Sequence, residues 1–292
     1  MYRKKWVAYI LISPMVLFIV AFLFYPFIVN VISSFFSYQS MLDESPKFVK
    51  LDNYITMFTD EIFQRSLLNT FILIALVIIF QVGLALILSL LVNSIKKFSS
   101  FYKIVFFMPI VISATAIGLM FNLFYEYNYG MFNQLLLAFG YEKIFWKDPE
   151  NLIRLFTLMV TPVIWQYVGF YFVIFLTGLS GINSEILEAA EIDGCNGFQK
   201  VRYISIPMIK NVTRVVFVLA ITGTLKVFDL PFIISPGGYP SGKLHFLGTY
   251  MYAKAFNSND IGFAAAFAVF IVIAGVLLSL VSNSILKHDN DL

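Results

Sequence analysis

Six stretches of this sequence are apolar over about 20 residues or more, the length that an α-helix needs to cross a bilayer. They are too uniformly apolar for membrane barrel strands, which alternate over about ten residues. The charged fraction of 13% and the mean hydropathy of +0.84 point the same way, because about a quarter of the residues of a soluble domain are charged. We therefore predict an all-α integral membrane protein, one domain over residues 1–292, with six transmembrane helices at 6–32, 67–91, 101–124, 153–179, 212–234 and 263–286.

The first stretch has the basic head and apolar body of a secretory signal. Its apolar run continues for about 25 residues and no small-residue cleavage site follows, so it is too long for the apolar region of a signal and long enough to span. We expect it to be retained as the first helix. Prolines inside the stretches are expected to kink their helices, which neighbouring helices can accommodate; they are Pro14, Pro26, Pro109 and Pro162.

The distribution of basic residues predicts the orientation, because Lys and Arg near the ends of spans stay on the cytoplasmic side. With six spans, the basic clusters all fall on one side, whereas the alternate loops, at 43–61, 126–150 and around Asp260, are longer and richer in acids. Both termini and the loop of about 180–211 are then expected in the cytoplasm. The basic residues are Arg3, Lys4, Lys5, Lys96, Lys97, Lys103, Lys200, Arg202, Lys210 and Arg214.

The loop after the fourth stretch is polar, and its residues predict two short helices. Asn183 or Ser184 can cap a first helix, acids occupy its first turns, and Gly194 supplies a left-handed stop. A second, amphipathic helix is expected from near Asn196 until Pro207. By itself, such a hairpin is compatible with a solvated connector that has ordinary caps.

The order of residues in this hairpin is more specific. The segment "EAAEIDGCNGFQKVRYISIP" resembles the EAA signature of ABC importer permeases, with Cys195, Val201 and Asn211 at places where that family usually has other residues. The segments "FYPFIVNVISSF", "WQYVGFYFVIFLTGLSGI" and "FDLPFIISPGGYP" are similar to maltose-type carbohydrate permeases, so the resemblance runs along nearly the whole chain. The signature places are held by Glu188, Ala189, Ala190, Asp193, Gly194, Ile204 and Pro207.

The resemblance implies an ABC type I importer permease bundle in the bacterial cytoplasmic membrane, one half of a heterodimer with a second homologous permease. It implies partners: two ATPase subunits, an extracellular solute-binding protein, a sugar, expected to be an oligosaccharide, and membrane lipid. ATP and Mg²⁺ would be bound by the ATPase, with no cofactor in this chain. The first short helix would couple to the ATPase: Glu188 as the anchoring acid, Ala189 and Ala190 permitting close approach, Gly194 fixing the bend, and Asp193 in the same set.

Other classes of protein are disfavoured by the residues themselves. One cysteine, Cys195, and two isolated histidines, His245 and His288, make no metal-ligand set, and no catalytic group of nucleophile, base and acid is evident. The segment 237–243, "GGYPSGK", has the glycine and lysine spacing of a phosphate loop but is followed by Leu244 instead of Ser or Thr. The basic residues are scattered along the sequence, so they form no basic patch of the kind that binds nucleic acid.

Polar residues inside the spans are the candidates for contact with substrate, since their burial is costly. By resemblance Gln166, Tyr167, Phe170 and Thr224 lie near the sugar site of the family, and amides beside aromatic rings suit sugar hydroxyls and C–H faces. Lys226 and Asp229 either bind substrate or neutralise each other. Uncharged residues of the set, with Asn122 and Gln81, can instead join helices.

Two alternatives to a sugar importer remain at this point. An ABC permease for another solute, such as glycerol phosphate, would use Lys226 as an anion partner. A stand-alone secondary transporter would need inverted repeats and an ion-coupling site, and the sequence indicates neither.

Overall fold

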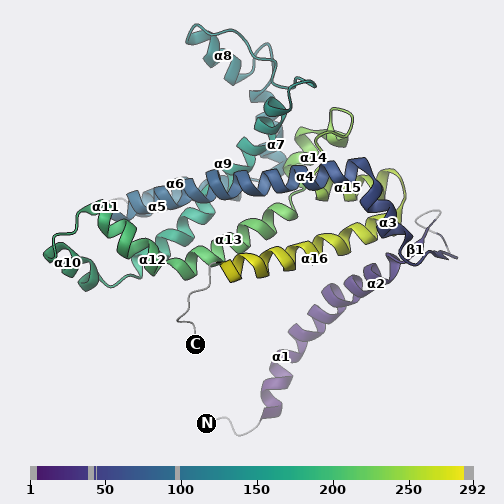
Figure 1. Ribbon diagram of the computed structural model, residues 1–292, viewed down its shortest axis with the longest axis horizontal. Helices are drawn as coiled ribbons and strands as arrows, with labels where there is room; N and C mark the ends of the chain where they lie inside the picture. The colour runs from purple at the N-terminus through teal and green to yellow at the C-terminus, as the bar shows by residue number, and fades with distance from the viewer. Residues whose placement is uncertain (1–4, 39–42, 44, 96–98, 286–292) are drawn as a thin grey trace. The chain divides into compact units, whose positions relative to one another are not determined.

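The computed structural model describes residues 5–38, 43, 45–95 and 99–285, and almost all of its regular structure is helical (Figure 1). Five helices are long and apolar enough to cross a membrane, and a bent pair, Ser99–Val111 and Ala114–Phe124, makes a sixth if it is counted as one span. The predicted helical membrane fold is thus confirmed. Predictions on Arg3, Lys4, Lys96, Lys97, Leu286 and His288 lie outside the described residues.

The elements follow the predicted stretches, with π-helical segments inside several of them. The first part of the chain forms α1 (Lys5–Ile19), η1 (Val20–Phe24), α2 (Tyr25–Ser33), β1 (Phe36–Ser37), β2 (Lys47–Phe48), α3 (Asp52–Thr59), α4 (Glu61–Leu76), η2 (Val77–Val82), α5 (Gly83–Ser94), α6 (Ser99–Val111), α7 (Ala114–Phe124) and α8 (Met131–Ala138). The rest forms α9 (Leu152–Ser180), α10 (Ser184–Ile192), α11 (Gly197–Lys200), η3 (Val201–Ser205), α12 (Ile206–Met208), α13 (Lys210–Leu225), α14 (Asp229–Ile234), η4 (Pro236–Gly238), α15 (Leu247–Tyr252), η5 (Ala253–Asn257) and α16 (Ile261–Ile285).

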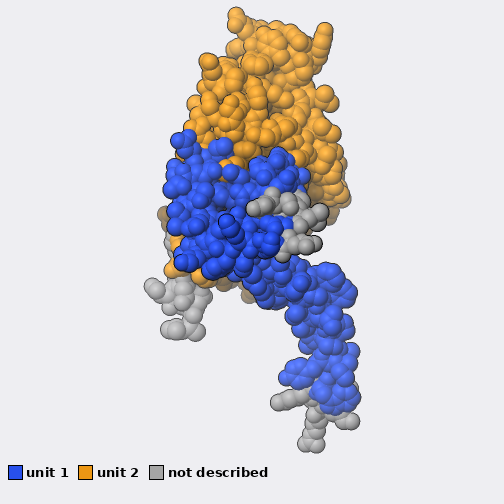
Figure 2. Space-filling model, turned by 90° about the vertical axis from the view of Figure 1, so that its right-hand side faces the viewer, with its two compact units in different colours: residues 1–64, 251–273 blue, residues 65–250, 274–292 orange. Residues whose placement is uncertain are grey.

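The chain divides into two compact units, coloured separately in Figure 2. Unit 1 comprises residues 1–64 and 251–273, and unit 2 comprises residues 65–250 and 274–292. The assignment of the whole chain to one permease domain therefore stays a prediction.

Unit 1 joins the end of the first long helix to the start of the last one. Asn53 Nδ2 donates to the carbonyl oxygens of Ser34 (2.8 Å) and Phe36 (3.0 Å), which fixes the chain where α2 gives way to the two-stranded ribbon β1–β2. The Phe63 and Phe267 rings meet edge to face, 5.0 Å apart. The helix from Trp6 to Ser33 is different, because the described residues bury no part of its membrane-length window.

Unit 2 is organised around α9, whose membrane-length window is 56% buried, more than that of any other span among the described residues. Its side chains pack against α5 and α6 around a core that includes Phe172 and Phe175. At Gly169 the backbone of α6 lies so close that a Cβ atom there would be 1.7 Å from the Phe106 carbonyl oxygen. This glycine therefore sets the distance between α6 and α9.

The two ends of unit 2 differ. In Figure 1 the end of α5, the start of α6 and the helices α10 to α12 gather at one end of this unit, whereas α7 and α14 lie toward the other. We call these the α10 end and the α14 end. The loop 181–209, close to the predicted loop of about 180–211, forms the α10 end.

Three of the spans in unit 2 are irregular. The α6 and α7 axes make an angle of 91°, so the third predicted span is bent sharply, three residues after Pro109. The second span contains the π-helical η2, and the fifth stops at Leu225 and resumes at Asp229. Pro14 and Pro162, in contrast, lie inside α1 and α9, and neither proline interrupts its helix.

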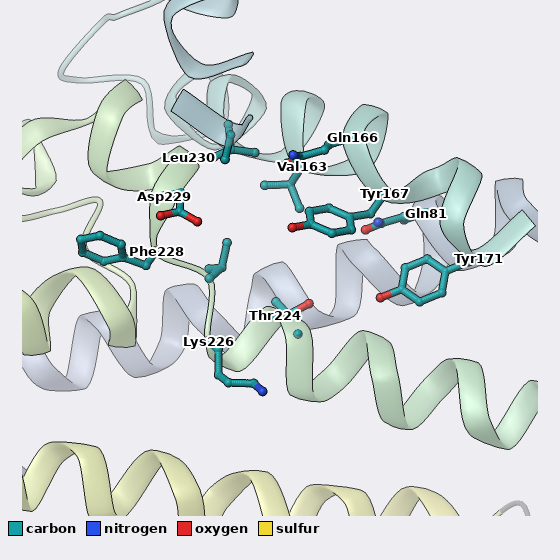
Figure 3. A pocket seen from close by; sticks show the side chains of 13 residues that line it. Gln81, Val163, Gln166, Tyr167, Tyr171, Thr224, Lys226, Phe228, Asp229 and Leu230 are labelled. Carbon is teal, nitrogen blue, oxygen red and sulfur yellow. The ribbon is translucent and has the colours of Figure 1, made fainter. Parts of the chain in front are cut away.

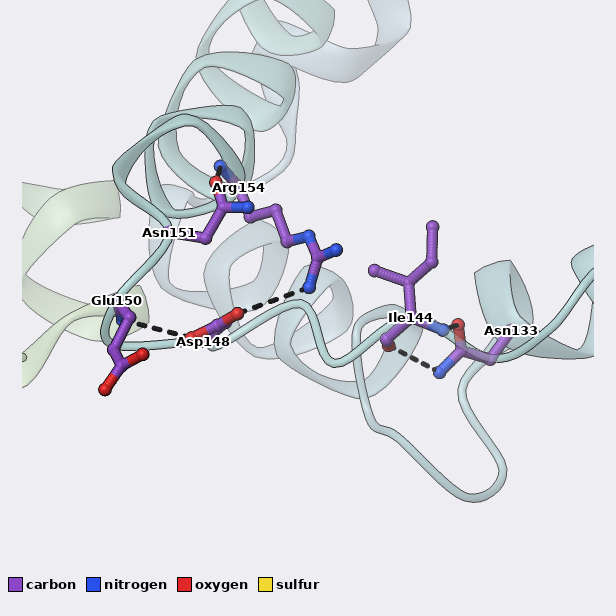
Figure 4. A network of polar contacts seen from close by, with 6 residues as sticks. All are labelled: Asn133, Ile144, Asp148, Glu150, Asn151 and Arg154. Carbon is purple, nitrogen blue, oxygen red and sulfur yellow. Dashed lines mark hydrogen bonds and ion pairs between the residues drawn. The ribbon is translucent and has the colours of Figure 1, made fainter.

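A hairpin of residues 125–151 around α8 extends from the end of α7, and the buried amide of Asn133 makes four of its hydrogen bonds. Figure 4 shows its contact with Ile144. Asn133 Nδ2 donates to the Tyr127 and Ile144 carbonyl oxygens (2.9 and 3.0 Å), and Asn133 Oδ1 accepts from the Ile144 amide and Trp146 Nε1 (3.0 and 3.1 Å). Near the start of α9, Arg154 pairs with Asp148 at 3.3 Å.

Replacing Asn133 with leucine should destabilise this hairpin by roughly 3 kcal/mol, because the four groups that bond to its amide all lose that hydrogen bond. Limited proteolysis of the purified protein in detergent should then cut within residues 126–150 much faster. The neighbouring exposed Gln134 makes one such bond, to Asn128 O at 2.9 Å, so Gln134→Leu is the matched control. Equal cleavage of both variants would contradict the role assigned to Asn133.

Candidate functional site: a cavity at three irregular spans

A cavity of about 140 Å³ opens in unit 2 where α9, η2, α13 and α14 approach one another (Figure 3). All of its walls belong to this unit, so its geometry is defined within one compact body. Its lining residues are Gln81, Ala114, Val163, Gln166, Tyr167, Tyr171, Gly223, Thr224, Lys226, Val227, Phe228, Asp229 and Leu230.

The cavity coincides with the irregular parts of three spans, of which two are interrupted and one is continuous with a π-helical segment. Gln81 comes from the π-helical η2, Ala114 follows the bend between α6 and α7, and residues 226–228 form the break between α13 and α14. Non-helical backbone at membrane depth is tolerated where it is buried in protein or lines a wet cavity, and π-bulges are frequent at functional sites. The irregular segments of three spans in unit 2 therefore converge on this cavity.

Two of the lining residues, Gln81 and Gln166, are buried carboxamides whose oxygens have no hydrogen-bond partner among the described residues. Gln81 is 1% exposed and Gln166 is 4% exposed. Gln166 Nε2 donates to Ile112 O at 3.4 Å, a carbonyl freed by the bend. The Thr224 hydroxyl donates to Ala220 O at 2.7 Å, which leaves its lone pairs toward other donors.

Five of the residues predicted to contact substrate line the cavity: Gln166, Tyr167, Thr224, Lys226 and Asp229. Phe170 and Asn122 do not. The Phe170 ring packs on Tyr171 (5.3 Å between centroids), and Asn122 Nδ2 donates to Ile233 O at 3.2 Å.

Lys226 and Asp229 are both exposed, and no ion pair joins them in the described structure. Figure 3 shows Lys226 extending away from Gln166 and Tyr167. Mutual neutralisation, one of the two interpretations of these charges, therefore has no support in the geometry.

Sequence reasoning missed Tyr171 and treated Gln81 only as a residue that joins helices. A signal for Tyr171 was present, because Val163, Tyr167 and Tyr171 recur every four residues and so share one face of α9. The signal for Gln81 was a polar residue inside an apolar span, but the direction of its side chain depends on the π-helical turn that carries it.

The loop 181–209 folds as its residues predict. Asn183 Oδ1 accepts from the Glu185 amide at 3.1 Å and caps α10, and Asn196 and Gln199 form a capping box on α11. Gly194 has φ +81°, and the Cys195 amide donates to Ala190 O at 2.9 Å, which closes the turn in a Schellman motif. The second helix, however, runs through Pro207 to Met208 before the chain breaks at Ile209.

The acids of this loop differ in their partners. Glu185 accepts from Asn183 Nδ2, and Glu191 pairs with Lys200 across the turn. Glu188 is exposed and, within the described chain, has no hydrogen bond or ion pair. Of the other predicted coupling residues, Ala189, Asp193 and Gly194 are exposed, and Ala190 is buried at 5%. Apolar side chains lie exposed nearby, Ile192 at 87% and Phe198 at 77%.

The hydrogen bond from Lys200, together with its charge, holds the pKa of Glu191 below its ordinary value of 4.5. A lowered pKa means that the pair stabilises the turn above pH 4.5 and that this support is lost as the pH falls through the lowered pKa. In wild-type protein, the amide protection of α10 and α11 should therefore decrease on acidification below pH 4.5.

Lys200→Met should show the faster amide exchange already at pH 7, with little further change in acid. Hydrogen exchange corrected for intrinsic rates measures both effects. Equal protection of wild type and variant at pH 7 would show that the pair does not support the turn.

The glycine-rich segment 237–243 follows the helix α14 and begins within the 3-10 turn η4. A phosphate loop instead follows a strand and opens a helix, so the local structure does not match that motif. His245, just beyond it, is buried at 6% with its Nδ1 3.2 Å from Thr249 Oγ1.

The chain is similar in sequence to known proteins along nearly its whole length. The model of the family described as "binding-protein-dependent transport system inner membrane component" matches residues 96–289. The chain is 32% identical to the probable ABC transporter permease protein YurN of Bacillus subtilis (strain 168), over 98% of this chain and 97% of that protein. It is 31% identical to the arabinooligosaccharides transport system permease protein AraP of the same organism, over 96% of this chain and 88% of that protein.

A solved structure shares the fold. In the crystal structure of a bacterial alginate ABC transporter in complex with an alginate pentasaccharide-bound periplasmic protein, one chain matches with a TM-score of 0.83. The two are 21% identical, and the match covers 96% of this chain and 94% of that one.

Proposed function

This chain belongs to the family of binding-protein-dependent transport system inner membrane components, and from that premise we propose that it carries a sugar, specifically an oligosaccharide, through the membrane. As a permease it is a transport subunit of an ABC importer and not an enzyme. The observation that carries the sugar assignment is the cavity at the irregular segments of three spans, which carboxamide and tyrosine residues line. AraP, a relative over nearly the whole chain, is a permease for arabinooligosaccharides.

A second, homologous permease completes the path in this proposal. The cavity of about 140 Å³ is smaller than complete ligand sites, which measure about 300–1,000 Å³, so this chain supplies one wall. The first helix, with none of its membrane-length window buried, offers apolar surface for a partner subunit and for lipid.

Two ATPase subunits would supply the energy and bind ATP and Mg²⁺. The loop 181–209 is suited to grip such a subunit, because α10 is capped at both ends and braced by the Glu191–Lys200 pair. Glu188 keeps its charge available for a base on the ATPase, and Ile192 and Phe198 add apolar contact area beside it. Asp193 and Gly194 hold the turn that presents this surface.

The α10 end of unit 2 is cytoplasmic in this proposal, and the chain termini lie on the same side. Lys200, Arg202, Lys210 and Arg214 belong to this end, as the positive-inside rule requires. The α14 end, with the α8 hairpin, would then face the extracellular binding protein, as the alginate transporter binds a periplasmic protein.

Transport would follow from differential stability of two arrangements of the permease pair. Closure of the ATPases on ATP would draw the α10 helices together, rock the two bundles, and open the cavity outward to the binding protein. Reopening of the ATPases would return the cavity to the cytoplasm and release the sugar.

The proposal is tested with the tagged chain purified in mild detergent from its host together with its associated subunits. An ATPase, a second permease and a binding protein should be recovered, and the complex in liposomes should take up neutral oligosaccharides only with ATP. Uptake without ATP, or recovery of the chain without an ATPase, would contradict it.

Within that system, Tyr167→Ala should lower the rate of sugar uptake about tenfold, since it removes a ring and a hydroxyl from the cavity wall. Phe170→Ala is the matched control on the same helix, because Phe170 does not line the cavity. Assembly with the ATPase should be intact in both variants. If Phe170→Ala reduced uptake as strongly as Tyr167→Ala, loss of packing would explain both.

A further inference from the structure

The short helix α3 of unit 1 presents three different sides, and one of them is apolar and exposed. Leu51, Ile55 and Phe58 recur at positions i, i+4 and i+7 and so share one side of the helix. Each is more than half exposed, at 56%, 61% and 51%. The next side is polar and also exposed, and it carries Asp52, Thr56 and Thr59. The third side is directed into unit 1, and it carries Asn53, Tyr54 and the fully buried Met57.

Contacts on the third side fix the rotation of α3 about its own axis. In Figure 1, α3 lies beside β1 at the end of α2. Asn53 Nδ2 donates to the carbonyl oxygens of Ser34 and Phe36, and the Tyr54 hydroxyl lies 2.7 Å from Ser34 Oγ. At the start of α16, a Cβ atom on Gly262 would be 1.9 Å from Phe36 O and 2.9 Å from Asn53 Nδ2. The apolar side therefore cannot turn inward to become buried.

The apolar side of α3 lies alongside a span and not beyond its end. The Phe58 ring meets the Phe270 ring edge to face, with 5.6 Å between centroids. Phe270 is inside α16, and roughly 13 Å of helix separates it from Ile261, the first residue of that span. The chain connection agrees, because only Asp60 separates α3 from the span that begins at Glu61. Phe58 thus reaches a depth at which spans are surrounded by lipid.

A bilayer surface matches all three sides of α3. A helix in the interfacial region places its apolar side among acyl chains and its polar side toward water, and here the third side is held by the protein itself. The apolar side is also continuous with exposed apolar surface on α16, because Phe270 and Ile273 are three residues apart and Ile273 is 52% exposed. A soluble binding protein could not reach a side chain that lies beside a span.

We propose that α3 is a membrane-surface anchor whose Leu51, Ile55 and Phe58 side chains insert among the upper acyl chains of one leaflet. In the orientation proposed above this is the outer leaflet. Because α3 is bonded to the end of α2 and touches the start of α16, the anchor holds the ends of both helices at a fixed depth. This role is separate from transport and does not depend on which solute is carried.

The test places a fluorescent amino acid, dansyl-alanine, at Ile55 or at Thr56 of the complete complex in phosphatidylcholine liposomes. Lipid brominated on the upper part of its acyl chains should quench the probe at Ile55 at least about twofold more than the probe at Thr56. Aqueous iodide should give the opposite order. Thr56 is the matched control, because it is the next residue on the same helix and is also exposed.

Two results of the quenching experiment would overturn the anchor. Iodide quenching of the Ile55 probe as strong as that of the Thr56 probe would show that the apolar side faces water. Protection of the Ile55 probe from both quenchers would show that another subunit covers this side of α3.

A second pair of variants tests the same contact without a probe. Ile55→Asp places a charge among acyl chains and should lower the thermal midpoint of the complex in liposomes by several degrees, whereas Thr56→Asp should change it by about one degree at most. Both side chains are exposed within the chain, so loss of internal packing is not the expected cause. Equal thermal midpoints for the two variants would contradict insertion of Ile55 into lipid.

Discussion

Replacing Glu188 with lysine is expected to abolish substrate-stimulated ATP hydrolysis by the assembled transporter. Glu188 is exposed on α10 and lacks an intrachain partner among the described residues, so its charge is free to pair with a base on the ATPase. Reversal of the charge would place two cations against each other at a desolvated contact, which costs several kcal/mol. The measurement is ATPase activity of the reconstituted complex with and without binding protein and sugar.

The control for this variant is Glu188→Asp, which keeps the negative charge at the same exposed position of α10. Both variants should insert into the membrane in normal amounts, and Glu188→Asp should retain stimulation. Because Glu188 makes no hydrogen bond or ion pair within the described chain, loss of fold is not an expected result of its replacement. Full stimulation in Glu188→Lys would refute the coupling role of this acid.

Gly169→Ala should destabilise the permease by more than about 3 kcal/mol, because its new methyl group would overlap the α6 backbone. The Cβ would lie 1.7 Å from Phe106 O and 2.3 Å from Phe106 C, atoms that cannot move aside as a side chain can. The thermal midpoint of the purified chain in detergent should fall by roughly 6 °C or more, or the folded protein should be lost.

Gly83→Ala provides the comparison. Gly83 begins α5 in the same unit, and nothing lies within 4 Å of the position that an added methyl group would take. Alanine there should be neutral or stabilising by about 0.5–1 kcal/mol, through helix propensity. If both glycines tolerated alanine equally, the close approach of α6 and α9 would not limit stability.

The spans and the polar loop could be predicted because local physics determines them. Long apolar runs can satisfy their backbone only as helices in lipid, and all six runs are helical in the structure. The caps at Asn183 and Asn196 and the left-handed Gly194 depend on residues within one turn of each other. Because these caps and this turn depend on neighbouring residues only, a single sequence is enough to predict them.

The geometry of the cavity could not be predicted, because the hydropathy pattern gives the length of each span but not the direction in which its helix runs. The run 101–124 remains apolar through its 91° bend, and Pro109 predicts a kink near Ile112 and Ser113 but neither its angle nor its direction. The convergence of that bend with η2 and the 226–228 break is a property of packing between spans. For this reason Gln166 and Thr224 were found by resemblance, whereas Gln81 was not assigned to the site.

The bare first helix has a consequence for how cells must make this protein. The segment Trp6–Ser33 is synthesised before the other spans of this chain, and the described residues bury no part of its membrane-length window, so it depends on a partner subunit or on lipid for cover. Any excess of this chain over its partner subunits would enter the bilayer with the first helix exposed to lipid. We expect such orphans to be degraded, which would tie the steady-state amount of this chain to the synthesis of its companion.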